Sequence, residues 1–429
     1  MRRVAYLLSF FMSAVLATSS NASAQDAPTQ DGPPPLRVFL DCGRCDFDHL
    51  RREVPVVDYM RDPADADVHV LVTTQGTGSG GQAYRFHFMG LGALEGRADT
   101  LVFVSQQFQT EDEERDGYTQ VFSLGLVRYL AYAGRTEGLG LDFGDQDDQD
   151  QQTVDPGADP WNLWVFEIDV GGELEGESRT KSTALEASFE AGRVTEELKV
   201  DVGLRGDYQK EEFKLRSGGL QVSSTREIEG DAMVVWSLGP NWSWGVSAAI
   251  GQDQSANQKF YVRASPALEY SFFPYAESTR RQVTATYRVG GVSYGYEERT
   301  LFLETTEVRP EQSLELSADF TQPWGELLVS LEGSHFLDDF EQHRVDLFTS
   351  LEFRLFRGVN LDVQASVARV KDQIYLSARG LDDNEILIGQ RELGTDFEYG
   401  LQLGLSFTFG SIFNNVVNPR LGDGGDDFN

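Results

Sequence analysis

The stretch FEYGLQLGLSFTF, residues 397–409, decides the fold class. Apolar and polar or small residues alternate along its whole length. Successive side chains of a β-strand point to opposite faces, so this strand presents one apolar face and one polar face. The apolar positions are Tyr399, Leu401, Leu403, Leu405, Phe407 and Phe409.

The same alternation recurs from about Trp161 onward and predicts about twelve strands. An even number of antiparallel strands with a period of two is the pattern of a transmembrane β-barrel. A soluble β-sandwich shows the same alternation, but its strands are about five or six residues long, and these longer runs favour the barrel. The predicted strands are 162–175, 183–194, 198–208, 227–238, 243–252, 259–273, 281–292, 312–321, 326–336, 343–355, 359–370 and 397–409.

The overall composition resembles that of an acidic soluble protein, with a formal net charge of −33 and 24% charged residues. A barrel dilutes its apolar residues one for one with polar residues that face the lumen, so mean hydropathy does not detect it. The large negative charge argues against nucleic acid as a partner.

Residues 1–24 are predicted to be a secretory signal peptide. Arg2 and Arg3 precede an apolar run that is too short for a membrane-spanning helix, and Ala22-Ser23-Ala24 is a small-residue cleavage site. Cleavage before Gln25 removes the two arginines and changes the net charge from −33 to −35. An exported chain with amphipathic strands is expected in an outer membrane, where closure of a barrel pairs every backbone group.

The connections between the predicted strands alternate in length, which predicts their orientation. Longer polar segments lie at 209–226, 293–311 and 371–396. Short periplasmic turns and long outer loops place both ends of the barrel, and the region before residue 160, in the periplasm. The tight connections are Glu196-Glu197, Pro240-Asn241, Pro274 to Arg280, Pro323-Trp324-Gly325 and Arg357-Gly358.

Aromatic residues gather near the predicted strand ends. Amphipathic rings at these positions are typical of the girdle that a barrel places at the membrane interface. The residues are Trp161, Trp164, Trp242, Trp244, Phe272, Phe273, Tyr275, Trp324 and Phe356.

A small α+β domain is predicted over residues 36–134, between a flexible leader at 25–35 and an acidic linker at 135–160. Its expected element order is β-α-β-β-β-α. The first helical pattern meets Pro55, so that helix is kinked there or ends by Val54. This order resembles that of the N-terminal domain of TolB. The resemblance implies a periplasmic domain that docks an unknown protein partner.

Cys42 and Cys45 are the two cysteines of the chain and are spaced C-x-x-C. An exported protein meets an oxidising compartment, which favours a disulfide between them. The alternatives are a redox-active dithiol, for which the neighbouring tryptophan and proline of thioredoxins are missing, and a metal site supplemented by His49.

Two further segments are candidate sites, and for each the alternative is an ordinary solvent-exposed polar segment. Ser334, His335 and His343 surround a predicted outer loop, and Ser334 with His343 would form the nucleophile and base of a lipase-like hydrolase. The pattern of His two residues before Ser, known from outer-membrane phospholipases, is absent. The acidic linker could bind calcium, but it lacks the glycine of an EF-hand loop, which favours a solvated tether.

The alternation assigns many charged residues to the lumen of the barrel. Acidic residues exceed basic ones, so the lumen is either filled by acid–arginine ladders or forms a hydrated pore that favours cations. The main candidates are Asp201, Arg205, Arg288, Glu315, Asp319, Glu332, Asp346, Glu352, Arg354 and Asp362, and the same face includes Glu167, Asp169, Glu186, Glu190 and Glu398.

By its strand pattern, signal peptide and aromatic end of the last strand, the chain resembles Gram-negative outer-membrane β-barrel proteins, in an uncharacterised group with an N-terminal periplasmic α+β domain. The resemblance covers 161–413 and implies contact with outer-membrane lipid and insertion by the barrel-assembly machinery. It carries over no functional residues and no cofactor. A C-terminal tail at 414–429 departs from it, because barrel sorting signals usually end on an aromatic residue.

These observations predict a non-enzymatic outer-membrane barrel with a periplasmic docking domain. The barrel is either a narrow channel that favours cations or a purely structural element. The alternatives are a lipase-like hydrolase that uses Ser334 and His343, and a periplasmic thiol module anchored by the barrel.

Overall fold

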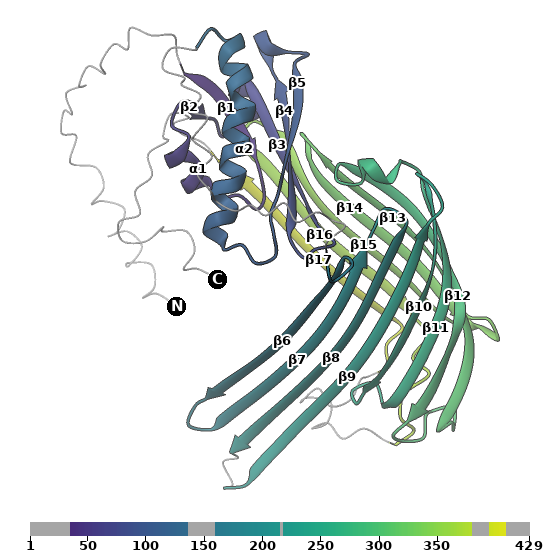
Figure 1. Ribbon diagram of the computed structural model, residues 1–429. Helices are drawn as coiled ribbons and strands as arrows, with labels where there is room; N and C mark the ends of the chain where they lie inside the picture. Colours follow the sequence, from purple (N-terminus) through teal and green to yellow (C-terminus); the bar gives the residue numbers. More distant parts are fainter. Residues whose placement is uncertain (1–34, 136–158, 215–217, 380–393, 409–429) are drawn as a thin grey trace, which may run out of the picture. The chain divides into compact units, whose positions relative to one another are not determined.

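The computed structural model describes residues 35–135, 159–214, 218–379 and 394–408, which form a five-stranded sheet with two helices and a separate twelve-stranded sheet (Figure 1). The predicted signal peptide and C-terminal tail lie outside the described residues, as do nearly all of the leader and the linker. No helix among the described residues is long and apolar enough to cross a membrane.

The first sheet belongs to a small α+β domain. Its strand order is β2-β1-β3-β4-β5. β1 is parallel to both β2 and β3, and β3, β4 and β5 are antiparallel neighbours. The elements are β1 (Leu36–Asp41), α1 (Phe47–Glu53), β2 (Val57–Tyr59), β3 (Val68–Gly76), β4 (Gln82–Gly90), β5 (Ala98–Val104) and α2 (Glu111–Tyr132), with short 3₁₀ turns η1 (Pro63–Asp65) and η2 (Gly92–Leu94).

The domain has one strand more than the predicted order β-α-β-β-β-α. α1 ends at Glu53, the backbone N–H of Val54 bonds to the carbonyl of Leu50, and Pro55 follows. Of the two outcomes that Pro55 allowed, the helix therefore ends by Val54. The chain then forms β2, which pairs with β1. A strand of three residues is too short to show a period, so the alternation could not reveal it.

Helix α2 packs on one face of this sheet and is well defined at both ends (Figure 1). Thr110 and Glu113 form a capping box at its start. At its end Gly134 has a φ of 69°, and the N–H groups of Gly134 and Arg135 bond to the carbonyls of Ala131 and Leu130, which is the Schellman arrangement. The buried core beneath α2 includes Val38, Val70, Phe86, Phe88, Tyr118, Phe122, Leu126 and Tyr129.

Gly125 allows α2 to approach β4 closely, because a Cβ atom there would overlap the ring of Phe88. We expect Gly125→Val to destabilise the domain by about 1–3 kcal/mol through overpacking. Leu124→Val is the matched control, since Leu124 is exposed on the same helix. Protease digestion of the full chain across a urea series measures the effect. Equal urea midpoints for the two variants would contradict this packing.

The second sheet has twelve strands in chain order, each antiparallel to its neighbours, which confirms the predicted strand number. The strands are β6 (Trp164–Gly176), β7 (Thr180–Val194), β8 (Leu198–Lys214), β9 (Leu220–Ser237), β10 (Trp242–Asp253), β11 (Gln258–Ser271), β12 (Arg281–Tyr296), β13 (Thr306–Gln322), β14 (Gly325–Phe336), β15 (Asp339–Phe356), β16 (Val359–Val370) and β17 (Phe397–Phe407).

The register of this sheet separates polar from apolar side chains. Directly opposed residues share a face, and the pairs can be followed across all twelve strands. One face, here called the polar face, carries the charged residues. The opposite, apolar face carries Ile168, Phe189, Val234, Val246, Val262, Tyr287, Leu314, Leu331, Leu347, Val363 and Leu403.

Two predicted loops are largely strand, so the prediction for 209–226 and 293–311 was wrong. Lys210 pairs with Ser224, and Tyr294 pairs with Glu307. In these segments apolar residues no longer alternate with polar ones, but the backbone hydrogen bonds between the paired strands continue. Hydrogen bonds between strands do not require an apolar face, so these hairpins extend beyond the apolar band.

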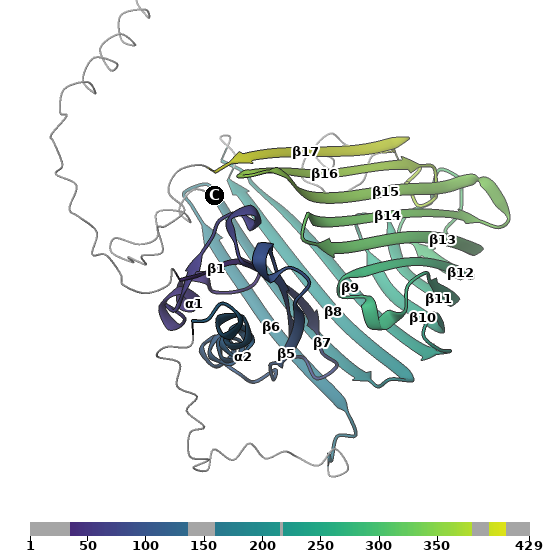
Figure 2. The same ribbon diagram turned by 90° about the horizontal axis from the view of Figure 1, so that it is seen from above.

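The sheet is curved, and its first and last strands, β6 and β17, lie at its two edges (Figure 2). Among the described residues no backbone pairing joins these two strands. Apolar side chains on the edges are accordingly more exposed than those inside the sheet: 73% for Ile168 and 64% for Leu403, against 40% for Leu347. The alternation predicts a closed barrel, whereas the described residues form an open, curved sheet.

All six tryptophans lie at the end of the sheet that carries the tight turns. On the apolar face the rings of Trp236 and Trp244 stack with centroids 4.5 Å apart, and Trp242 lies 4.7 Å from Tyr270. Tryptophan residues are therefore concentrated in one band at this end of the sheet.

Candidate functional site

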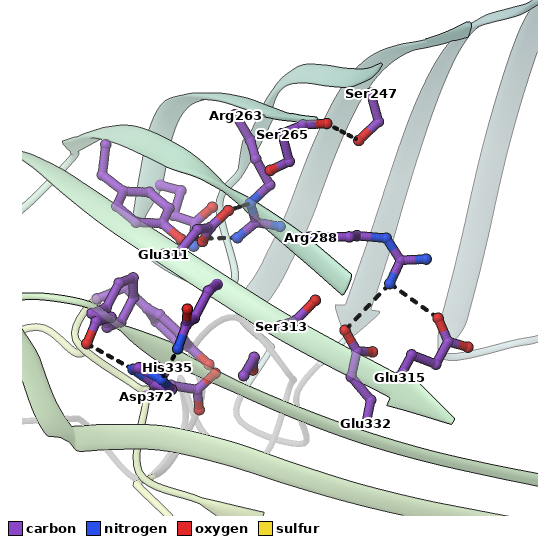
Figure 3. Close-up of a pocket in the computed structure, with 16 residues that line it drawn as sticks. Ser247, Arg263, Ser265, Arg288, Glu311, Ser313, Glu315, Glu332, His335 and Asp372 are labelled. Carbon is purple, nitrogen blue, oxygen red and sulfur yellow. Dashed lines mark hydrogen bonds and ion pairs between the residues drawn. The ribbon is translucent and has the colours of Figure 1, made fainter. Parts of the chain in front are cut away.

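The candidate site is a cavity of about 540 Å³ on the polar face of β10 to β14 (Figure 3). It lies toward the end of the sheet opposite the tight turns, and the segment 371–379 that follows β16 contributes to its lining. Its lining residues are Ser247, Gln258, Arg263, Ser265, Arg288, Tyr294, Glu311, Gln312, Ser313, Glu315, Glu332, Ser334, His335, Phe336, Asp372 and Tyr375.

Arg288 is the centre of the first charged group in the cavity. Its Nη1 lies 3.0 Å from Glu315 Oε2 and 3.8 Å from Glu332 Oε1, and its side chain points between the two carboxylates (Figure 3). Glu315 and Glu332 are directly opposed across β13 and β14. Their mutual repulsion is relieved by the single guanidinium.

Arg263 forms the second charged group. Its Nε lies 2.8 Å from Glu311 Oε1, and its Nη2 donates to the hydroxyl of Tyr294 at 3.3 Å. Arg263 is on β11 and Glu311 on β13, so this ion pair crosses the intervening strand β12. The contact links β11 to β13 across the polar face of β12.

The segment 371–379 is tied to neighbouring loops by backbone hydrogen bonds. Thr300 and Ser377 form an isolated β-bridge, the N–H of Leu301 bonds to the carbonyl of Leu376, and that of Ala378 bonds to Arg299. The side chain of Asn257 donates to the carbonyls of Tyr375 and Glu298 and accepts from the N–H of Glu298. Three connections of the same sheet end are thereby joined through one buried amide.

This segment also brings an apolar wall to the cavity. Ile374 is buried against Val292, Tyr294, Tyr296 and Phe336, in a cluster on the otherwise polar face. Tyr375 packs beside them. One side of the cavity is therefore aromatic, and the other carries the ion pairs.

Asp372 adds a carboxylate at the same end. Among the described residues it forms no ion pair. Burial raises the pKa of the Asp372 carboxyl, an effect that the guanidinium of Arg344 opposes. The lining has four carboxylates and two guanidinium groups, so its net charge is negative at neutral pH. The carboxylates belong to Glu311, Glu315, Glu332 and Asp372, and the guanidinium groups to Arg263 and Arg288.

The structure places all the predicted lumen charges on the polar face. Of these, it brings Arg288, Glu315 and Glu332 together in the cavity. Asp346 pairs instead with Arg344 at 2.9 Å, and Arg205 pairs with Asp207 at 2.8 Å. The remaining candidates lie on the same face outside this cavity; they are Asp201, Asp319, Glu352, Arg354 and Asp362.

The Ser–His pair weighed from the sequence is not assembled. Ser334 lies opposite Arg344 on the polar face, whereas His343 lies opposite His335 on the apolar face. His343 Nδ1 is 3.1 Å from the carbonyl of Phe340, and His335 Nε2 is 2.7 Å from Gln312 Nε2. Because Ser334 and His343 point to opposite sides of the sheet, a hydrolase mechanism that joins them is wrong.

Cys42 and Cys45 are joined by a disulfide between β1 and α1, with their Cα atoms 5.6 Å apart. His49 would be the third ligand of the metal site considered from the sequence. Its Nε2 lies 3.1 Å from Asp116 Oδ1. No group of three or more metal-ligating side chains occurs within the described ranges.

Three of the six acidic and arginine residues that line the cavity were not identified from the sequence, namely Arg263, Glu311 and Asp372. Arg263 continues the alternation of a predicted strand and could have been found. Glu311 was assigned to a loop because the predicted strand began one residue later. Asp372 and Tyr375 follow the last regular alternation, and no local pattern indicates that their segment contacts the polar face.

No protein-family model matches the chain, and no curated protein matches it. Among solved structures it is similar to the beta domain of the Bordetella autotransporter BrkA, at 11% identity and a TM-score of 0.27, over 57% of this chain and 98% of that one. It is also similar to the Pseudomonas putida toluene transporter TodX, at 10% identity and a TM-score of 0.22, over 48% and 72%. Likenesses this remote carry no information on substrate or activity.

Substitution of Asn257 tests whether its side-chain hydrogen bonds hold the segment 371–379 against the neighbouring connections. Its φ of 56° suits glycine, so Asn257→Gly removes the side-chain hydrogen bonds without backbone strain. Loss of three buried hydrogen bonds, at about 1 kcal/mol each, should accelerate amide exchange in 371–379 by roughly tenfold or more. Hydrogen–deuterium exchange with mass spectrometry measures this rate.

Asn241→Gly is the control, because it removes the bond from Asn241 to the carbonyl of Ser271 at the tight-turn end. It should leave exchange in 371–379 unchanged. Slow exchange of that segment in Asn257→Gly would show that Asn257 does not hold it.

Proposed function

We propose that the chain is a non-enzymatic outer-membrane β-barrel whose hydrated interior forms a narrow channel that favours cations. The observation that carries the proposal is the separation of the two faces of the twelve-stranded sheet. Along the middle of the strands the charged side chains lie on one face and the other face is apolar, whereas charged residues on the apolar side, such as Lys181, Lys210 and Arg281, lie near the strand ends.

The apolar face has the dimensions of a membrane-spanning band. On β17 the exposed apolar residues run from Phe397 to Phe407, a span of about 34 Å along the strand at about 3.4 Å per residue, which is about 24 Å across a membrane for a strand tilted by about 45°. The tryptophans at the tight-turn end supply one aromatic border. A soluble protein that left this face in water would expose an apolar patch far beyond the few hundred Å² that monomers tolerate.

Insertion into lipid requires that β6 and β17 pair with each other. Each unpaired N–H or C=O in hydrocarbon costs several kcal/mol, so neither edge can stay open there. With twelve alternating strands, the first and last run antiparallel, and an antiparallel pairing closes the barrel without a crossover. The high exposure of Ile168 and Leu403 would fall to the level inside the sheet.

The same proposal places the tight turns and the α+β domain in the periplasm. Such barrels usually have short periplasmic turns and longer outer connections, and the longest connection of this sheet, between β16 and β17, lies at the end opposite the tryptophans. The barrel-assembly machinery and outer-membrane lipid are then its partners, and the domain would dock a periplasmic protein. The cavity would lie near the outer mouth.

Closure can be tested by disulfide formation between the edge strands. Ile168→Cys is combined in turn with cysteine at Leu401, Leu403 and Leu405, all on the apolar face. We expect one register to cross-link within the folded chain in membranes and to change its mobility in a non-reducing gel. Cross-links that form only between two chains would contradict closure. Ile168→Cys paired with Leu314→Cys, in the middle of the sheet, is the negative control.

Ion selectivity tests the channel. A unit charge about 8 Å from a permeating ion contributes about 0.5 kcal/mol in water, so each neutralised carboxylate changes the preference roughly twofold. Glu315→Gln with Glu332→Gln should therefore lower the ratio of cation to anion permeability, measured from reversal potentials in a salt gradient. Glu95→Gln, on the exposed surface of the α+β domain, should not change it. The absence of conductance in the parent protein would contradict the channel.

A further inference from the structure

We infer that the cavity between β10 and β14 binds a small organic cation that carries an aromatic or other apolar group. The inference deepens the proposed function and rests on it, because it names the class of ligand that the channel would admit at its outer mouth. Its three supports are the charge of the lining, the position of Asp372, which forms no ion pair among the described residues, and the apolar wall.

The charge of the cavity selects a cation. Arg263 is matched by Glu311, and Arg288 is shared between Glu315 and Glu332. These contacts leave a carboxylate in excess within the Arg288 group, and Asp372 adds another. An ammonium group entering the cavity would supply the missing positive charge, whereas a carboxylate or phosphate would meet net repulsion.

The apolar wall selects an organic cation over a metal ion. Tyr294, Phe336 and Tyr375 line the cavity, and Val292 and Ile374 pack in the same cluster. The guanidinium of Arg309 already lies over the ring of Phe336, 4.5 Å from its centroid, which shows that this wall accepts a cation and leaves Tyr375 as the ring for a ligand. An aromatic face attracts a cation through its quadrupole and also accommodates an apolar ring. A hydrated metal ion would gain nothing from this wall, and no metal-ligating group of three side chains lies within the described part of the chain.

The size and polar rim of the cavity fit a compact ligand. About 540 Å³ lies within the range of small-molecule sites. The side chains of Ser247, Ser265 and Ser313 lie around the charged groups (Figure 3), and Ser334 also lines the cavity. An amine with one ring can reach both walls, with its ammonium at the carboxylates and its ring at Tyr375.

The experiment is isothermal titration calorimetry of the full chain in detergent micelles at neutral pH. The probes are phenethylamine, its neutral analogue 2-phenylethanol and its anionic analogue phenylacetate. We expect phenethylamine to bind measurably and at least roughly tenfold more tightly than the other two, since one charge-assisted hydrogen bond supplies about that factor. Equal binding of the three probes, or none by phenethylamine, would overturn the inference.

Two variants locate the site. Asp372→Asn should weaken phenethylamine binding by roughly tenfold through loss of the charged partner. Tyr375→Leu should weaken it while preserving the discrimination against phenylacetate. The controls are Glu352→Gln, on the polar face outside the cavity, and Tyr399→Leu, on the apolar face, neither of which should alter binding. Unchanged binding in both Asp372→Asn and Tyr375→Leu would place the ligand elsewhere and refute the assignment.

The binding measurement does not depend on conductance. Cation-selective conductance without phenethylamine binding would reject the ligand class and leave the channel standing. Binding that follows the variants in a protein that does not conduct would reject the channel and leave the site standing.

Discussion

The structure depends on the hydrogen-bonded register between neighbouring strands of the large sheet. Side chains alternate with a period of two, so a slip of one residue in any pair would turn charged residues such as Glu332 and Asp346 toward the apolar face. The register therefore determines both surfaces at once. The same ladder extends past the apolar band in the β8–β9 and β12–β13 hairpins, since backbone pairing is satisfied whatever the side chains contact.

The candidate site follows from that register together with the curvature of the sheet. Opposed acidic residues on β13 and β14 would repel each other, and Arg288 on β12 relieves the repulsion from the neighbouring strand. The pair between Arg263 and Glu311 crosses β12. Charge balance on this face is thus a property of three or four adjacent strands. The apolar wall has a different origin, because Ile374 and Tyr375 come from a connection that Asn257 holds against its neighbours.

The accuracy of the sequence-based predictions followed the length of each periodic run. Twelve strands were predicted because each run holds several alternations, and Leu401, Leu403 and Leu405 are an unambiguous example. The three-residue strand β2 was missed because one alternation is not a pattern. The sequence predicts loops at the hairpin ends, because their polar residues no longer alternate with apolar ones. The pairing of Ser334 with His343 was wrong because it depended on a register between two strands, and a single strand contains no information on that register.

The sequence by itself determined which residues point to the same side of each strand, and hence that the chain has an apolar and a charged surface. It did so because the direction of a side chain along a strand depends on local backbone geometry alone. Tertiary structure decided which charges meet. Arg288 contacts Glu315 and Glu332, and Tyr375 lies beside Phe336, only after strand register, sheet curvature and the tie through Asn257 are established. These are distances between segments far apart in the chain, and no local period encodes them.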